Sequence, residues 1–309
     1  VGLTALAGSL ALTAAHAGEM SVSGSMVATY NKRDTKESTT NPFGMKTNLT
    51  FSGSTELDNG MTASMFTTSS DRFAGQYSGK ITLDMGDAGT IALDQASGGG
   101  MFDIDDVTPK AYEESWDGVT DADEETVPDG LSADNMFTYK SPSFDGTTVT
   151  IGYVPSGVSG VTPKDSYMDF SVVNSNGLVD GLTVGLAMGE SEETVGTTID
   201  NTILYGTYTT GGLTVGATRS EDDGPTTATQ VDFQAVGVTY AITDDFSVGY
   251  NQSVSDRGNA TIDQESSGIS ASYTSGGITI GGMINDVDNV AFTDSDDTEG
   301  YEFNISFAF

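Results

Sequence analysis

Apolar and polar side chains alternate with a period of two along almost the whole chain from residue 19 onward. Between Met45 and Leu57, for example, one parity carries methionine, leucine and phenylalanine, and the other carries lysine, asparagine, threonine and glutamate. This period is typical of a β-strand with one apolar and one polar face. It predicts an all-β chain of sixteen strands, at approximately residues 19–31, 45–57, 61–71, 76–86, 89–96, 134–143, 147–155, 166–176, 182–190, 199–210, 213–221, 229–242, 245–255, 266–275, 278–287 and 300–309.

The connections between these segments alternate in length. Tight turns such as Asp58-Asn59-Gly60 follow the even-numbered segments, and they are rich in residues that accept a positive φ or form Asx turns. Longer polar connections follow the odd-numbered segments, except at the short link 72–75. Short turns at one rim and long loops at the other are typical of an antiparallel transmembrane β-barrel. A soluble β-sandwich would show the same alternation of side chains, but it leaves the alternating loop lengths unexplained.

The composition suits a barrel better than a thick core. Only 36% of the residues are hydrophobic, and 39 of the 309 are glycine. A thin apolar skin around a wet interior needs few large aliphatic side chains. No run of residues after the first 17 approaches the ~20 apolar residues of a transmembrane helix, so an integral form of this chain must cross the membrane with strands.

Charge and residue usage exclude several functional classes. The formal net charge of −34 argues against a nucleic-acid partner, because binding a polyanion needs clustered lysine and arginine. Cations are the expected companions. The chain has no cysteine and a single histidine, His16, so thiolate nucleophiles, disulfides and cysteine-based zinc sites are excluded. Without these activators an enzyme is not expected.

The first seventeen residues have the features of a signal peptide that lacks its basic start. They contain no lysine, arginine, aspartate or glutamate, and they end in Ala15-His16-Ala17, the small-x-small pattern that signal peptidases cut. The expected mature chain is a single barrel domain, 18–309.

The strand predicted at 229–242 breaks its phase. Val231 and Phe233 share one face, whereas Val236, Val238 and Tyr240 take the other. The sequence leaves two interpretations open, a β-bulge near Ala235 or an error in the assumed register.

Taken together, these features resemble the Gram-negative general porins, most closely the alphaproteobacterial type. The resemblance rests on the signal cut before a strand that starts "GEMSVSGSMVATY", the even number of amphipathic strands, the long third loop and a terminal aromatic strand that ends in Phe309. It implies a channel in the bacterial outer membrane for passive diffusion of small hydrophilic solutes and ions. It also implies contact with outer-membrane lipid, a homotrimer, and a role for Phe309 as a membrane insertion signal.

The connection at about 97–133 is long, acidic and contains a single lysine, Lys110. The resemblance implies that it folds into the lumen and narrows the pore, with Tyr112 and Trp116 as anchors against the wall. An external acidic flap is the alternative. The acidic side chains expected at the constriction are Asp103, Asp105, Asp106, Glu113, Glu114, Asp117, Asp121, Asp123, Glu124 and Glu125.

A basic wall is expected opposite this loop. Residues 1–80 are balanced in charge, so the whole net negative charge lies after residue 80. General porins set a basic wall against an acidic third loop, and the resemblance assigns this role to Arg33, Lys46, Arg72 and Lys80. The alternative is that these are ordinary solvated lumen residues. Because carboxylates outnumber bases here, the sequence predicts a cation-selective pore.

Two acidic clusters offer hard oxygen ligands that calcium prefers. One contains Asp121 and Asp123, and the other contains Asp294 and Asp296. Neither has the spacing of a helical calcium loop with its central glycine, so solvated loop charge is the favoured interpretation and no cofactor is expected. A secreted or surface-attached acidic calcium-binding β protein with an adhesion role remains the alternative function.

Overall fold

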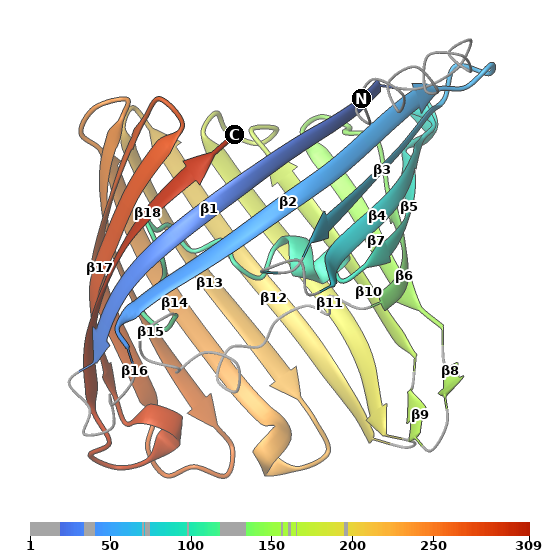
Figure 1. Cartoon of the computed structure of the whole chain (residues 1–309). Helices are drawn as coiled ribbons and strands as arrows, with labels where there is room; N and C mark the ends of the chain where they lie inside the picture. The colour runs from blue at the N-terminus through green and yellow to red at the C-terminus, as the bar shows by residue number, and fades with distance from the viewer. Residues whose placement is uncertain are drawn as a thin grey trace.

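The chain closes into one barrel of sixteen antiparallel strands (Figure 1). Every barrel strand pairs with its neighbour in sequence, and β1 also pairs with β18 to complete the ring. The predicted fold class and strand number are therefore confirmed. The computed structural model describes residues 19–33, 41–69, 71, 75–97, 99–117, 134–155, 157–159, 162–164, 166–194 and 197–309.

The strands begin and end within a few residues of the predicted segments. Two three-residue strands, β8 (Gly157–Ser159) and β9 (Thr162–Lys164), form a separate hairpin that is too short to produce a sequence period. Short 3-10 helices are η3 (Gly86–Ala88), η4 (Gly100–Asp103), η6 (Thr227–Thr229) and η7 (Val290–Phe292). The barrel strands are β1 (Glu19–Arg33), β2 (Phe43–Glu56), β3 (Thr62–Ser69), β4 (Gln76–Asp84), β5 (Thr90–Gln95), β6 (Asp134–Lys140), β7 (Thr147–Val154), β10 (Tyr167–Ser175), β11 (Leu182–Thr194), β12 (Thr197–Thr210), β13 (Leu213–Asp223), β14 (Gln230–Ala241), β15 (Phe246–Arg257), β16 (Gln264–Ser275), β17 (Ile278–Asp288) and β18 (Thr298–Ala308).

The barrel wall places polar side chains on its buried inner face and apolar side chains on its exposed outer face, the reverse of a soluble protein. On β15 the inward side chains of Asn251 and Ser253 are buried, while the outward side chains of Tyr250 and Val254 are exposed. Large outward side chains reach high exposure, as at Ile284 with 69%. A continuous exposed apolar surface of this kind requires an apolar surrounding. The soluble sandwich is therefore wrong. Among the described residues, no helix is long and apolar enough to cross a membrane.

The C-terminal residue closes the seam between β1 and β18. The backbone N–H of Phe309 donates to the carbonyl of Gly24 at 3.0 Å, and the N–H of Gly24 donates back to the carbonyl of Phe309 at 2.8 Å. The Phe309 side chain is 71% exposed. The aromatic end of the chain thus completes the ladder and leaves its ring on the surface.

Strand β14 carries no bulge. It pairs in unbroken register with β13 and β15, including at Ala235. The phase break arises because Phe233 and Ala235 face inward and are buried, whereas Val236 and Tyr240 face outward and are exposed. The sequence interpretation of a bulge or a shifted register is therefore wrong. Phe233 is instead an apolar side chain that points into the barrel.

The wall is uneven in height. The strands β3 to β6 have only six to nine residues each, whereas β1 has 15 and β12 has 14. Figure 1 shows this short stretch of wall beside the long strands β1 and β2.

Candidate functional site

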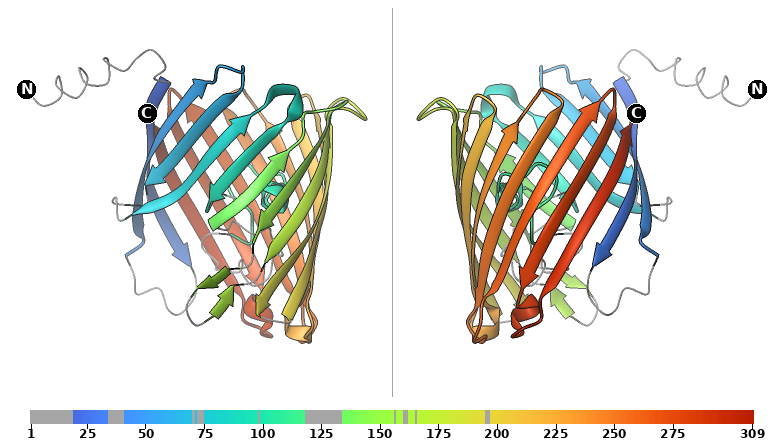
Figure 2. Two further views of the ribbon diagram at one scale, coloured as in Figure 1. Left: turned by 90° about the vertical axis from the view of Figure 1, so that its right-hand side faces the viewer. Right: turned by 90° about the vertical axis from the view of Figure 1, so that its left-hand side faces the viewer.

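The connection between β5 and β6 runs along the inner face of the barrel. Figure 2 shows its described part, which includes η4, within the ring of strands. Hydrogen bonds join residues 101–115 to inward-facing side chains of β10, β13, β15, β16, β17 and β18. We call residues 99–117 the inner loop.

The start of the inner loop is held by a buried carboxylate on β10. Asp169 is 1% exposed, and its Oδ2 accepts hydrogen bonds from the Met101 N–H at 2.9 Å and the Tyr167 hydroxyl at 2.7 Å. Its Oδ1 accepts from the Gly152 N–H at 2.9 Å. Sequence reasoning missed Asp169, although its place on the polar parity of a strand was a usable signal.

An apolar cluster fixes the next turn of the inner loop. Met101 and Ile104 pack against Ala187 of β11 and against Ile203 and Tyr205 of β12, and all five are buried. Apolar side chains on an inner barrel face are costly in a water-filled lumen unless something covers them. The loop provides that cover.

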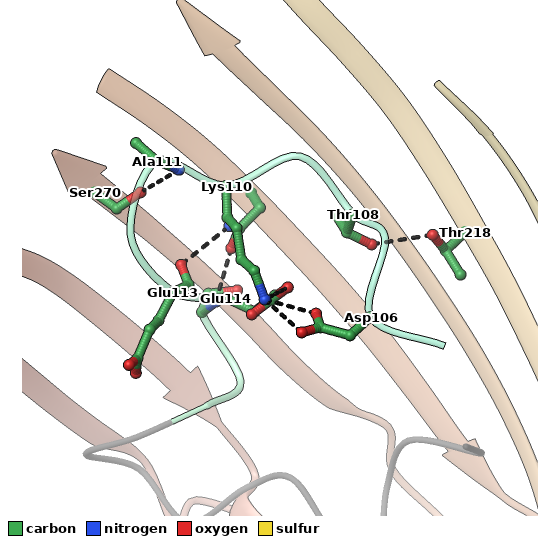
Figure 3. A network of polar contacts seen from close by, with 10 residues as sticks. Asp106, Thr108, Lys110, Ala111, Glu113, Glu114, Thr218 and Ser270 are labelled. Carbon is green, nitrogen blue, oxygen red and sulfur yellow. Dashed lines mark hydrogen bonds and ion pairs between the residues drawn. The ribbon is translucent and has the colours of Figure 1, made fainter. Parts of the chain in front are cut away.

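Lys110 lies between two carboxyl groups of the inner loop (Figure 3). Its Nζ is 2.7 Å from both carboxylate oxygens of Asp106, and it also contacts Oε1 of Glu114. The Glu114 side chain is fully buried, and burial, with a hydrogen bond to Asp106, raises its pKa to about 10. Partial desolvation of Asp106 by the surrounding loop works against its ionised form, but the hydrogen bonds from Glu114 and Lys110 outweigh this effect and lower the pKa of Asp106.

At neutral pH Glu114 is therefore protonated, Asp106 is ionised and Lys110 is charged, so the three side chains together carry no net charge. Glu114 was expected among the acidic side chains that line the pore, and this expectation needs correction. Glu114 is completely buried within the inner loop, and this burial keeps it protonated.

Tyr112 joins the inner loop to β18. Its hydroxyl donates to Oε1 of Glu302 and accepts from Nδ2 of Asn304 at 2.7 Å. Burial, followed by repulsion from Glu302 and Asp117, raises the pKa of the neighbouring Glu113 to about 7. Glu302 was not among the predicted site residues, although the alternation of the terminal strand places it on the polar face.

Ser115 and Trp116 fasten the far end of the inner loop. The Ser115 N–H donates to Oδ1 of Asn251 at 2.7 Å, its hydroxyl bonds the Ser266 hydroxyl at 2.7 Å, and its carbonyl accepts from Nδ2 of Asn285 at 2.9 Å. Each such bond stabilises the loop by about 1 kcal/mol. The Trp116 ring packs edge-on against Phe233 with centroids 5.1 Å apart, which explains the inward phenylalanine on β14.

A disulfide tests this placement directly. The hydroxyl oxygens of Ser115 and Ser266 are 2.7 Å apart, so cysteines at both positions are close enough for an S–S bond of about 2.05 Å. The double variant S115C/S266C should form the bond quantitatively under mild oxidant, and no native thiol competes because the chain has no cysteine. Alkylation under denaturing conditions, read by intact mass with S115C as the control, measures it. Two free thiols after oxidation would contradict this position of the loop.

The predicted basic wall is only partly described. Lys80 of β4 forms an ion pair with Asp94 of β5 at 2.7 Å, and Asp94 also accepts hydrogen bonds from Ser97 at the start of the connection. The Lys46 ammonium lies 5.2 Å from the centroid of the Tyr77 ring. Arg72 and the side chain of Arg33 lie outside the described residues.

The other acidic side chains predicted at the pore or at a calcium site differ in exposure, and some lie outside the described residues. Asp103 and Asp106 are exposed on the inner loop, whereas Asp105, Glu113 and Asp117 are half-buried. In the part of the chain that the structure describes, no group of three or more acidic or histidine side chains is arranged to hold a metal ion. Asp294 and Asp296, two possible calcium ligands, are exposed in the connection between β17 and β18. Asp121, Asp123, Glu124 and Glu125 lie outside the described residues.

A family model matches the sequence, and solved structures match the fold. A sequence model described as Gram-negative porin matches residues 2–261 and 165–309. Comparison with curated protein sequences finds no match.

Several solved structures share the barrel at low sequence identity. The anion-selective porin from Comamonas acidovorans has a TM-score of 0.72 at 13% identity, covering 94% of this chain and 100% of that one. Salmonella typhi OmpF in complex with daunomycin has a TM-score of 0.73 at 15% identity, covering 95% and 98%. A mutant of Rh. blastica porin has a TM-score of 0.67 at 17% identity, covering 94% and 100%.

Proposed function

The chain belongs to the Gram-negative porin family, whose members are outer-membrane channels, and we propose that its pore is cation-selective and is narrowed by the inner loop. The contacts of the inner loop support the narrowing. It occupies the inner face from β10 to β18, so the remaining passage lies between the loop and the inner face of β1 to β7.

The charges on the two sides of this passage support cation selectivity. On the loop, Asp103 is exposed and Asp105 and Glu113 are half-buried, and the function we propose has them reach the lumen together with Glu302 of β18. Two of the bases, Lys80 and Lys110, offer little compensation, because the first is paired with Asp94 and the second with Asp106. The fold alone does not set selectivity, since one structural neighbour is an anion-selective porin. Carboxylates that outnumber the bases along a pore concentrate cations and repel anions.

The experiment is reconstitution of the purified protein in planar lipid bilayers. Stepwise conductance together with a zero-current potential of cation-selective sign across a KCl gradient is the expected result. A potential of the opposite sign would overturn the proposed selectivity and leave the channel assignment intact. Liposome swelling in sugars tests passage of small hydrophilic solutes, as the function requires.

We also propose a homotrimer, and the short wall supports it. A six-residue strand such as β5 extends about 20 Å and, tilted by about 45°, rises only about 14 Å, less than the ~25 Å apolar band of such barrels. Lipid would meet polar backbone on this side. Other copies of the chain packed against β3 to β6, as the resemblance implies, would cover it. Crosslinking of intact outer membranes should give three-subunit species.

Export and insertion make a separate prediction. Residues 1–17, the proposed signal peptide, lie outside the described residues. Deleting Phe309 removes the two backbone hydrogen bonds at the seam, about 1 kcal/mol each, and the proposed insertion signal. Synthesis should be unchanged, the mature chain should still begin at Gly18, and the amount in the outer membrane should fall. Fractionation and N-terminal sequencing measure both. Undiminished insertion without Phe309 would refute its role.

A further inference from the structure

Five consecutive strands each place one inward glycine beneath the inner loop. A β-carbon at four of them would come closer than 3.0 Å to a loop atom, a separation that real β-carbons essentially never show, and at the fifth, Gly268, it would lie 3.0 Å from Cβ of Ser115. The five are Gly216 on β13, Gly237 on β14, Gly249 on β15, Gly268 on β16 and Gly281 on β17. We call them the glycine floor.

The closest approaches are at Gly237 and Gly281. A β-carbon at Gly237 would overlap the carbonyl oxygen of Pro109, and one at Gly281 would overlap the ring of Tyr112. At Gly216 it would lie 2.9 Å from Cδ of Pro109. Gly216 and Gly237 are directly paired across β13 and β14, so the wall is flat over two strands where Pro109 crosses it.

Hydrogen bonds hold the loop down on the same floor. The Thr108 hydroxyl bonds the Thr218 hydroxyl at 3.1 Å, two residues from Gly216 on the same strand (Figure 3). The Ala111 N–H donates to the Ser270 hydroxyl at 3.2 Å, and Ser270 is the cross-strand partner of Gly249. The loop is therefore clamped beside the glycines that make room for it.

Barrel stability does not explain these glycines. Glycine weakens a strand interior and commonly marks a close approach of another backbone. The outward Gly206 of β12 provides the contrast, because a β-carbon there would meet nothing closer than 3.7 Å. At Gly237 and Gly249 the atom met first is backbone of the inner loop, whereas at glycines elsewhere in the wall, such as Gly24 and Gly185, it is a side chain of the wall itself.

We propose that the glycine floor sets the bore of the channel by letting residues 108–115 lie flush against the wall. Gly237 and Gly281 are thus positioning residues for permeation, and the inference rests on the proposed constriction. A methyl group at Gly237 would move the Pro109 backbone toward the pore axis by about 1 Å before ordinary contact is restored. The passage narrows by the same displacement.

The test compares Gly237→Ala and Gly281→Ala with Gly206→Ala as the matched control. The two floor variants should lower single-channel conductance, and they should slow liposome swelling more for large sugars than for small ones. Gly206→Ala should behave as the wild type. If Gly237→Ala does not assemble, Gly216→Ala, whose new methyl group meets the Pro109 ring and the Thr207 methyl group, should give a conductance change of the same sign. Unchanged conductance and size dependence in the floor variants would overturn the proposal.

A second comparison separates this proposal from the constriction itself. In a chain that lacks residues 103–129, Gly237→Ala should have no effect on conductance, because the loop through which it acts is gone. A loss of conductance in that background would overturn the glycine floor. The proposed constriction is tested separately by the same deletion in the chain that keeps Gly237. If that deletion does not raise conductance, the constriction is refuted.

Discussion

Removal of residues 103–129 should raise single-channel conductance by about twofold or more, because a sixteen-stranded barrel without its loop leaves a wide aqueous lumen. The barrel should persist. Every ladder hydrogen bond that closes the ring joins strand to strand, including the β1–β18 seam, and none depends on the inner loop. Polar groups that now bond the deleted residues, such as Thr218 and Asn251, would bond water instead.

Planar bilayers give the conductance, and circular dichroism confirms the barrel. The control is deletion of residues 157–164, since the β8–β9 hairpin there pairs only with itself and should leave conductance unchanged. Equal conductance with and without the inner loop would show that the loop does not narrow the pore.

The sequence predicted the strands because the wall is built from local rules. A strand between lipid and water needs side chains of alternating polarity, and a rim of tight turns needs glycine and aspartate. Both signals can be read within about ten residues. The family resemblance added the expectation that the third loop enters the lumen and that Tyr112 and Trp116 contact the wall.

The contacts between loop and wall could not be read in the same way, because they join distant residues. Phe233 looked like an error of register because its partner, Trp116, is far away in the chain. Glu114 looked like a pore charge because nothing local reveals that it is buried beside Lys110. The floor glycines are indistinguishable in sequence from other strand glycines until the path of the loop is known.

Cation selectivity should increase as the pH rises through about 7, because Glu113 gains its charge there. Burial, then Glu302 and Asp117, raise its pKa from 4.5 to about 7, while Lys110 and the Tyr112 hydroxyl act in the opposite direction. With that pKa, the ionised fraction of Glu113 goes from about 10% at pH 6 to about 90% at pH 8. A raised pKa means that the carboxyl is neutral on the acidic side, so the pore has one negative charge fewer at pH 6.

The neighbouring residue provides a matched control. Glu114→Gln should keep the wild-type pH dependence, because the pKa of about 10 leaves Glu114 neutral from pH 6 to pH 8 and glutamine preserves its shape. Glu113→Gln should remove the change between pH 6 and pH 8 and hold selectivity near its low-pH value. The measurement is the zero-current potential across a KCl gradient at each pH.

Salt distinguishes a diffuse acidic field from a specific ion site. The Debye length falls from about 8 Å at 0.15 M to about 3 Å at 1 M, so only charges at the narrowest part of the passage act at high salt. The pH-dependent part of the potential should therefore shrink in concentrated KCl, although Glu113 still titrates. If the potential is independent of salt, cations are held by direct coordination. If the wild type shows no pH dependence at low salt, Glu113 does not face the permeating ions, and selectivity must come from the other lumen carboxylates, Asp103 and Asp105 on the loop and Glu302 on the wall.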